Sequence, residues 1–205
     1  IKDNELKINC LKDEEIQIKD LDNKILSKFP QKKTNSDAFK ILLINVSTPF
    51  TKDRGISEYD VLEPPLGLIA LQTYLNKEFG EKIKGKVIKT RVDFNSYEEL
   101  NEIIKKYNPD AIGASVMTFH KDFFHSIVKS IRENGYEKTI IAGGPHPTTS
   151  YQEVLKDSNV DICAIGEGEM TLKEIIDKLM KNKGSKLDIT QLNAIDGIAY
   201  NKANL

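Results

Sequence analysis

Residues 139–149 read Thr-Ile-Ile-Ala-Gly-Gly-Pro-His-Pro-Thr-Thr, an apolar run followed directly by two glycines and two prolines. A second apolar run at 160–165 is followed in the same way by Gly-Glu-Gly-Glu at 166–169. We expect the two runs to be neighbouring strands and the glycine-rich segments to be turns at their carboxyl ends. Open α/β sheets bind ligands at that edge, so this stretch predicts both a fold class and a candidate site.

The glycines in these turns have two interpretations. Because glycine has no Cβ and adopts positive φ freely, the backbone can pass close to a bulky ligand. Alternatively, glycine only makes the tight turn between a strand and the next helix. The sequence leaves both interpretations open.

An alternation of strands and helices extends outward from this stretch over most of the chain. Apolar patterns predict strands at 41–46, 86–92, 111–116, 139–142 and 160–165, and helices at 65–79, 96–107, 122–134, 150–156 and 171–181. This spacing predicts a parallel sheet with right-handed crossovers. We therefore expect an α/β fold with a flavodoxin-like (Rossmann-like), doubly wound, five-stranded parallel sheet. Residues 195–200 are expected to add an edge strand or to form half of a hairpin.

The first 39 residues differ in composition and are expected to form an N-terminal extension and linker ahead of an α/β domain at 40–205. Alternating apolar residues at 6–18 predict a charged hairpin, and residues 22–29 predict a short helix.

Composition excludes some classes of partner. Lys and Arg number 30 against 31 Asp and Glu, so bulk charge favours neither nucleic acid nor an anionic membrane. No apolar run reaches the roughly 18 residues of a membrane span, and the first twenty residues are charged, which predicts a cytoplasmic protein. The two cysteines, Cys10 and Cys163, are expected to be reduced and structural.

A strand order of 2-1-3-4-5 would open a crevice between the first and third strands. Ser47 and Thr48 leave the first strand, and residues 115–118 (Ser-Val-Met-Thr) leave the third. The connection at 48–64 is longer than usual for such a loop, which is typical of a functional segment. It contains Thr-Lys-Asp-Arg-Gly at 51–55, but it lacks the ending of a phosphate-binding loop.

All three histidines, His120, His125 and His146, fall near the carboxyl ends of predicted strands. A spacing of five residues turns the first two away from one another on a helix, which disfavours a zinc site. His146 is the best candidate for ligand contact, since it projects from the glycine turn. Glu167 and Glu169 can accept hydrogen bonds from a ligand, or they only complement the amino terminus of the following helix.

With these residues placed, the chain resembles the cobalamin-binding domain that precedes the catalytic barrel in many radical S-adenosylmethionine enzymes. The matching features occur in the family's order over residues 40–200: an apolar first strand, Pro-Pro-Leu-Gly-Leu at 64–68, Ser-Val-Met-Thr at 115–118, Gly-Gly-Pro-His-Pro-Thr at 143–148, Asp161 with Gly-Glu-Gly-Glu at 166–169, and Gly-Ile-Ala-Tyr at 197–200.

The resemblance implies that a corrinoid lies over the carboxyl edge of the sheet, with its nucleotide tail in the crevice between strands one and three. The cofactor-binding residues that it implies are Ser47, Thr48, Leu66, Gly67, Ser115, Val116, Met117, Thr118, Gly143, Gly144, Pro145, His146, Gly166, Glu167 and Gly168.

Two features depart from the wider pattern of such proteins. Domains that place a protein histidine on cobalt carry Asp-x-His-x-x-Gly in the first βα loop, and residues 48–64 contain no histidine. Radical chemistry needs three cysteines for an iron–sulfur cluster, and this chain has two. We therefore expect no catalytic residue and no metal ligand in these 205 residues. The cluster and S-adenosylmethionine would belong to a catalytic domain after Leu205 or on another chain.

Three hypotheses follow. The first is a corrinoid-binding module that serves methyl transfer or radical chemistry. The second is a related scaffold or protein-interaction domain that has lost cobalamin, whose crevice its own side chains would fill. The third is an enzyme that uses a small nucleotide or flavin, for which the sequence offers no convincing nucleophile–base pair.

Overall fold

A computed structural model of the chain describes residues 27–28, 32–54, 63–182 and 184–204. The chain divides into two units, Ile1–Lys33 and Thr34–Leu205, and the sheet with its helices belongs to the second. The predicted hairpin at 6–18 and most of the predicted helix at 22–29 lie outside the described residues. No helix in the described part of the chain is long and apolar enough to cross a membrane.

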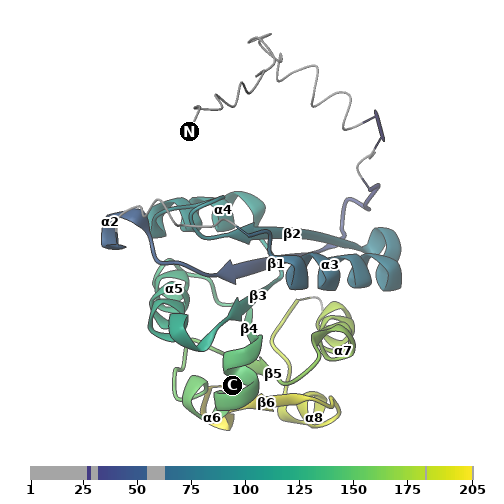
Figure 1. The fold of residues 1–205 in the computed structure, drawn as a ribbon. Helices are drawn as coiled ribbons and strands as arrows, with labels where there is room; N and C mark the ends of the chain where they lie inside the picture. Colours follow the sequence, from purple (N-terminus) through teal and green to yellow (C-terminus); the bar gives the residue numbers. More distant parts are fainter. Residues whose placement is uncertain (1–26, 29–31, 55–62, 183, 205) are drawn as a thin grey trace, which may run out of the picture. The chain divides into compact units, whose positions relative to one another are not determined.

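One six-stranded sheet organises the second unit (Figure 1). Its spatial order is β2-β1-β3-β4-β5-β6, in which β1 to β5 pair in parallel and β6 is antiparallel to β5. The strands are β1 (Phe39–Val46), β2 (Ile83–Lys89), β3 (Ala111–Val116), β4 (Thr139–Gly143), β5 (Ile162–Ala164) and β6 (Ile198–Tyr200). The predicted α/β class, the strand order and the added edge strand are confirmed.

Two helical layers cover the sheet. On one face pack α3 (Leu66–Phe79), α7 (Gly168–Lys181) and α8 (Ile189–Asn193), and on the other α4 (Tyr97–Tyr107), α5 (Lys121–Glu133) and α6 (Pro145–Val154). A short helix, α2 (Thr51–Arg54), follows β1, and three 3₁₀ turns lie at Gly80–Lys82, Thr118–His120 and Lys202–Asn204. Apolar side chains of the strands alternate between two cores, as expected for a sheet buried on both faces.

Strand β2 and helix α6 differ most from their predicted positions. Strand β2 begins and ends three residues earlier than predicted, because the backbone turns after Lys89 and the amides of Val92 and Asp93 donate to the Lys89 carbonyl. Helix α6 begins at Pro145 and has a kink at Ser150 (φ −137°, ψ 32°), the residue at which the predicted helix begins. Proline is tolerated there because the first turn of a helix leaves its amides unpaired anyway.

Asp161 fixes the two strands that carry the glycine turns. Its buried carboxylate accepts hydrogen bonds from the Ile140 amide (2.7 Å), from Arg132 (2.6 Å) and from Lys186 (2.7 Å). A buried carboxylate is stable only with such partners. The start of β4 is thereby tied to the residue before β5. Cys163, in β5, is buried and unbonded, and burial raises the pKa of its thiol to about 12.

Candidate functional site

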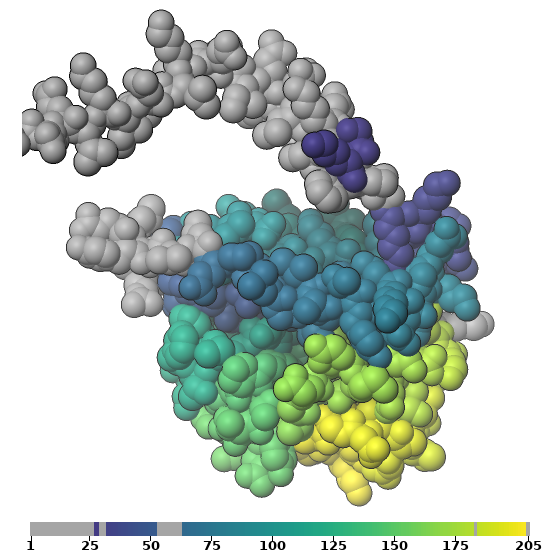
Figure 2. Space-filling view, turned by 45° about the vertical axis from the view of Figure 1, so that its right-hand side comes forward, coloured from purple at the N-terminus to yellow at the C-terminus, as the bar shows by residue number. Residues whose placement is uncertain are grey.

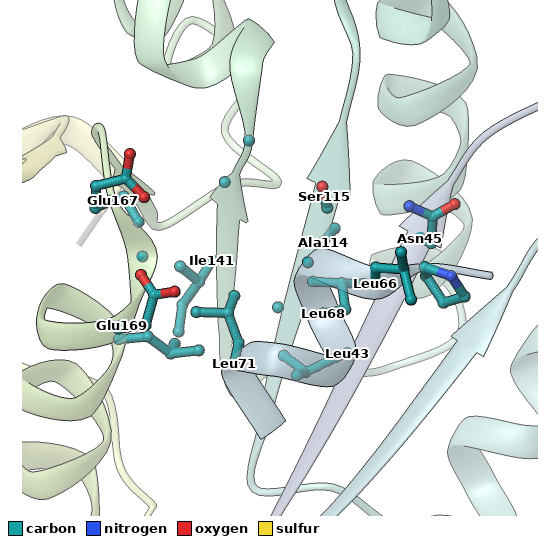
Figure 3. Close-up of a pocket in the computed structure, with 18 of the residues that line it drawn as sticks. Leu43, Asn45, Leu66, Leu68, Leu71, Ala114, Ser115, Ile141, Glu167 and Glu169 are labelled. Carbon is teal, nitrogen blue, oxygen red and sulfur yellow. The ribbon is translucent and has the colours of Figure 1, made fainter. Parts of the chain in front are cut away.

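A cavity of about 410 Å³ opens near the carboxyl ends of the strands, between the sheet and helices α3 and α7 (Figure 3). The two helices contact one another, and Figure 2 shows them next to each other on the surface. The cavity is lined by Leu43, Asn45, Pro64, Pro65, Leu66, Gly67, Leu68, Leu71, Gly113, Ala114, Ser115, Ile141, Gly143, Gly144, Pro145, Ala164, Gly166, Glu167, Gly168, Glu169 and Leu172.

The cavity exists because some residues on this face of the sheet are small. In β3, Ile112 and Val116 belong to the core under α4 and α5, whereas Gly113 and Ser115 line the cavity. Ser115 pairs with Gly143 of β4 in the sheet register. Successive side chains of a strand point to opposite faces, so small residues at every second position leave space on one face of the sheet only.

Gly144 is required by the backbone. Its φ is +96°, and a Cβ on it would lie 2.9 Å from Ser115 Oγ and 3.2 Å from the Val116 carbonyl oxygen. Any other residue there is strained by its φ and crowded by β3. Gly144 therefore fits the tight-turn interpretation.

Gly143 differs from its neighbour. A Cβ on Gly143 would meet no atom closer than the Cβ of Ala164, at 4.0 Å. None of the described residues requires glycine at this position, and a longer side chain would enter the cavity. Gly143 therefore fits the ligand-approach interpretation.

The second glycine turn joins the first across the carboxyl edge. The amide of Gly166 donates to Thr148 Oγ1 (3.1 Å), which links the start of α6 to the loop before α7. A Cβ on Gly168 would lie 3.2 Å from Leu71 Cδ2, so glycine lets α7 approach α3 closely. Glu167 is the N-cap residue of α7, and Glu169 lies in its first turn.

The structure gathers nine of the predicted site residues around this cavity and leaves six outside it. Lining it are Leu66, Gly67, Ser115, Gly143, Gly144, Pro145, Gly166, Glu167 and Gly168. The six outside it are Ser47, Thr48, Val116, Met117, Thr118 and His146.

The outlying residues have other surroundings. Ser47 shares a hydrogen bond of 2.7 Å with the Thr90 hydroxyl, and Val116 is buried in the core on the opposite face. Thr48 is half-buried just beyond β1. Met117 and Thr118 are exposed directly after β3. They lie at the carboxyl edge but do not contribute to the cavity wall.

His146 was expected to project from the glycine turn toward a ligand, and its position corrects that view. The residue lies in the first turn of α6 with 1% of its surface exposed. Neither ring nitrogen has a hydrogen-bond partner among the described residues. Burial lowers the pKa of the imidazole, which is therefore kept neutral.

Sequence reasoning missed the deep part of the cavity. Leu43, Gly113 and Ile141 share one row of the sheet register, and Leu68, Leu71 and Leu172 cover them from the helices. The available signal was the run of three small residues, Gly-Ala-Ser at 113–115, inside the apolar strand.

Several large apolar side chains stay exposed near the cavity and the carboxyl edge. Leu66 is 69% exposed and Met170 59%, at the starts of α3 and α7, while Met117 and Phe119 are 43% and 74% exposed after β3.

Comparison with known proteins gives the family. Residues 56–176 match the model of the B12 binding domain. An uncharacterized methyltransferase of Pyrococcus horikoshii is 30% identical over 165 residues, which cover 78% of this chain and 32% of that protein.

Solved structures share the fold. The cobalamin-dependent S-adenosylmethionine radical enzyme OxsB, with aqua-cobalamin and S-adenosylmethionine bound, superposes with a TM-score of 0.64 at 22% identity, over 82% of this chain and 21% of OxsB. The radical S-adenosylmethionine methyltransferase TsrM from Kitasatospora setae, with cobalamin and an iron–sulfur cluster bound, gives 0.61 at 19% identity, over 80% of this chain and 27% of TsrM. This chain thus spans a third or less of each relative, and it belongs to the B12-binding domain family.

Proposed function

We propose that this chain binds a corrinoid at the carboxyl edge of its sheet and presents it to a catalytic domain outside these 205 residues. The observation that carries the proposal is the cavity between α3, α7 and the sheet, bordered by both glycine turns. Its volume of about 410 Å³ falls in the range of small-ligand sites.

The cavity has room for one part of a corrinoid. The cavity is too small for a whole corrinoid, but it can accept a nucleotide tail while the corrin ring stays outside. Gly143 leaves the sheet side of the wall free of a side chain. The exposed Leu66, Met117 and Phe119 offer apolar surface near the ring. Ser47, Thr48 and Thr118 add hydroxyl groups along the same edge.

A bound corrinoid supplies cobalt, which can carry a methyl group. This chain's residues hold and orient the cofactor, and the two cysteines of the sequence cannot supply the three thiolates that the cluster of a radical S-adenosylmethionine enzyme needs. The cluster and S-adenosylmethionine are therefore assigned to a catalytic domain that follows Leu205 or belongs to another chain. The similarity to longer radical enzymes supports this assignment.

The alternative of a scaffold that has lost cobalamin has a structural signature, a crevice filled by the protein's own side chains. The described side chains instead leave the cavity open. This observation favours the corrinoid-binding module.

Filling the cavity tests the proposal. Gly143→Val adds an isopropyl group at a position where only a Cβ has room, so it should weaken cobalamin binding about tenfold or more, because overpacking costs roughly 1–3 kcal/mol. Equilibrium dialysis against hydroxocobalamin gives the dissociation constant, and thermal unfolding reports the fold.

Thr139→Val is the matched control. Thr139 is buried at the opposite end of the same strand, its hydroxyl has no partner among the described residues, and valine has the same shape. The control should bind cobalamin as the wild type does. Equal affinity of Gly143→Val and the wild type would contradict the proposed place of the cofactor.

A further inference from the structure

The cavity changes in polarity with depth. Its floor is formed by Leu43, Gly113 and Ile141 of the sheet, covered by Leu71 and Leu172 of the helices. Leu43 and Ile141 are 1% and 2% exposed. The backbones of these three strand residues belong to the parallel ladders, so the floor offers a ligand few hydrogen bonds.

Polar side chains lie nearer the carboxyl edge. In the described part of the cavity wall they are Asn45, Ser115, Glu167 and Glu169. Asn45 and Ser115 are paired in register, one row above the floor, and Figure 3 shows both above Leu43. A ligand group that enters this cavity therefore passes polar side chains before it reaches an apolar end.

We propose that this cavity selects corrinoids by their lower base, favouring an apolar benzimidazole over a purine such as adenine. The inference rests on the proposed function. Corrinoids differ in the base that ends the nucleotide tail, and the ribose and phosphate before it are polar. The order of surfaces along the cavity, polar and then apolar, matches a benzimidazole tail.

A purine fits this floor poorly. Its ring nitrogens and exocyclic amine would leave water and meet Leu43, Ile141 and Leu172, which cannot hydrogen-bond. A buried polar group without a partner weakens binding about tenfold or more. A benzimidazole carries fewer such groups and buries more hydrocarbon.

Three corrinoids separate the possibilities: cobalamin with dimethylbenzimidazole, pseudocobalamin with adenine, and cobinamide without a nucleotide. Equilibrium dialysis of the full chain against each, read by corrin absorbance, gives three dissociation constants. We expect cobalamin to bind about tenfold or more tightly than each of the other two.

Each other outcome overturns the inference in a distinct way. Equal binding of cobalamin and pseudocobalamin, with cobinamide weaker, would show that the cavity holds the base without selecting it. Equal binding of cobalamin and cobinamide would show that the base lies elsewhere, while the proposed function stands. Binding of none of them would defeat the proposed function as well.

A variant of the cavity wall gives a second test. Leu71 lies on α3, lines the cavity and is half-buried, so a polar side chain of similar length is tolerable there. Leu71→Gln places an amide beside the base and should reduce the preference for cobalamin over pseudocobalamin severalfold. Leu71→Met is the control and should keep the preference. An unchanged ratio in a folded Leu71→Gln variant would contradict the inference.

Discussion

Gly144 lies so close to Ser115 that a Cβ on the glycine would stand 2.9 Å from the serine hydroxyl oxygen. The contact joins the turn after β4 to the end of β3, where the cavity begins. A small residue at one position thus sets the distance between two strand ends that border the proposed cofactor site.

Gly144→Ala should therefore destabilise the fold. The φ of +96° and the contact with Ser115 together should cost about 1–3 kcal/mol. Thermal unfolding measures the loss. Gly143→Ala is the neighbouring control and should unfold near the wild-type temperature, since its Cβ has room. Equal midpoints for the Gly144→Ala variant and the wild type would show that the turn relaxes without cost.

The buried His146 predicts a dependence of stability on pH. Burial lowers its pKa below the usual 6.5, so below that value the unfolded chain binds a proton that the folded chain does not. Folding stability should therefore fall as the pH drops below 6.5.

His146→Leu should remove this part of the pH dependence. The measurement is the unfolding midpoint near neutral pH and again about one pH unit below 6.5. The midpoint should fall further in the wild type than in His146→Leu. Each 1 kcal/mol of lost stability lowers the midpoint by about 2–4 °C. A fall of the same size in the variant would mean that other groups cause the effect.

Bound cobalt should carry no histidine of this chain. Residues 48–64 contain no histidine, and His146 is buried. His125 Nδ1 lies 2.6 Å from an Asp157 carboxylate oxygen, and the ring of His120 packs edge-on against Phe119, with the ring centres 4.4 Å apart. Labelling all histidines with nitrogen-15 should leave the electron paramagnetic resonance spectrum of bound cob(II)alamin unchanged. Altered nitrogen coupling in the labelled protein would place an imidazole on the metal.

The sequence predicted those features that depend on local pattern. The apolar run at 111–116 gave the bounds of β3 as observed, and the glycine turns pointed to the carboxyl edge. The part of α6 before its kink at Ser150 was not predicted, because the two prolines at 145 and 147 resemble a loop, whereas a first helical turn accepts proline.

The depth of the site was not predictable in the same way. Leu43, Ile141 and Leu172 look like ordinary core residues, and only the packing of α3 and α7 over the sheet leaves a cavity above them. His146 stands beside a glycine turn in the sequence, but the helix that begins at Pro145 directs its ring into the protein interior. Tertiary packing determines both the depth of the cavity and the position of the His146 ring.

The most direct test of the account is retention of the cofactor by the wild-type chain. The protein is incubated with excess hydroxocobalamin and desalted, and its visible spectrum is recorded, since corrin absorbs where protein does not. The account predicts about one corrinoid retained per chain, as expected for one preformed site. A correctly folded chain that leaves the column without corrin absorbance would contradict the assignment of this cavity to cobalamin.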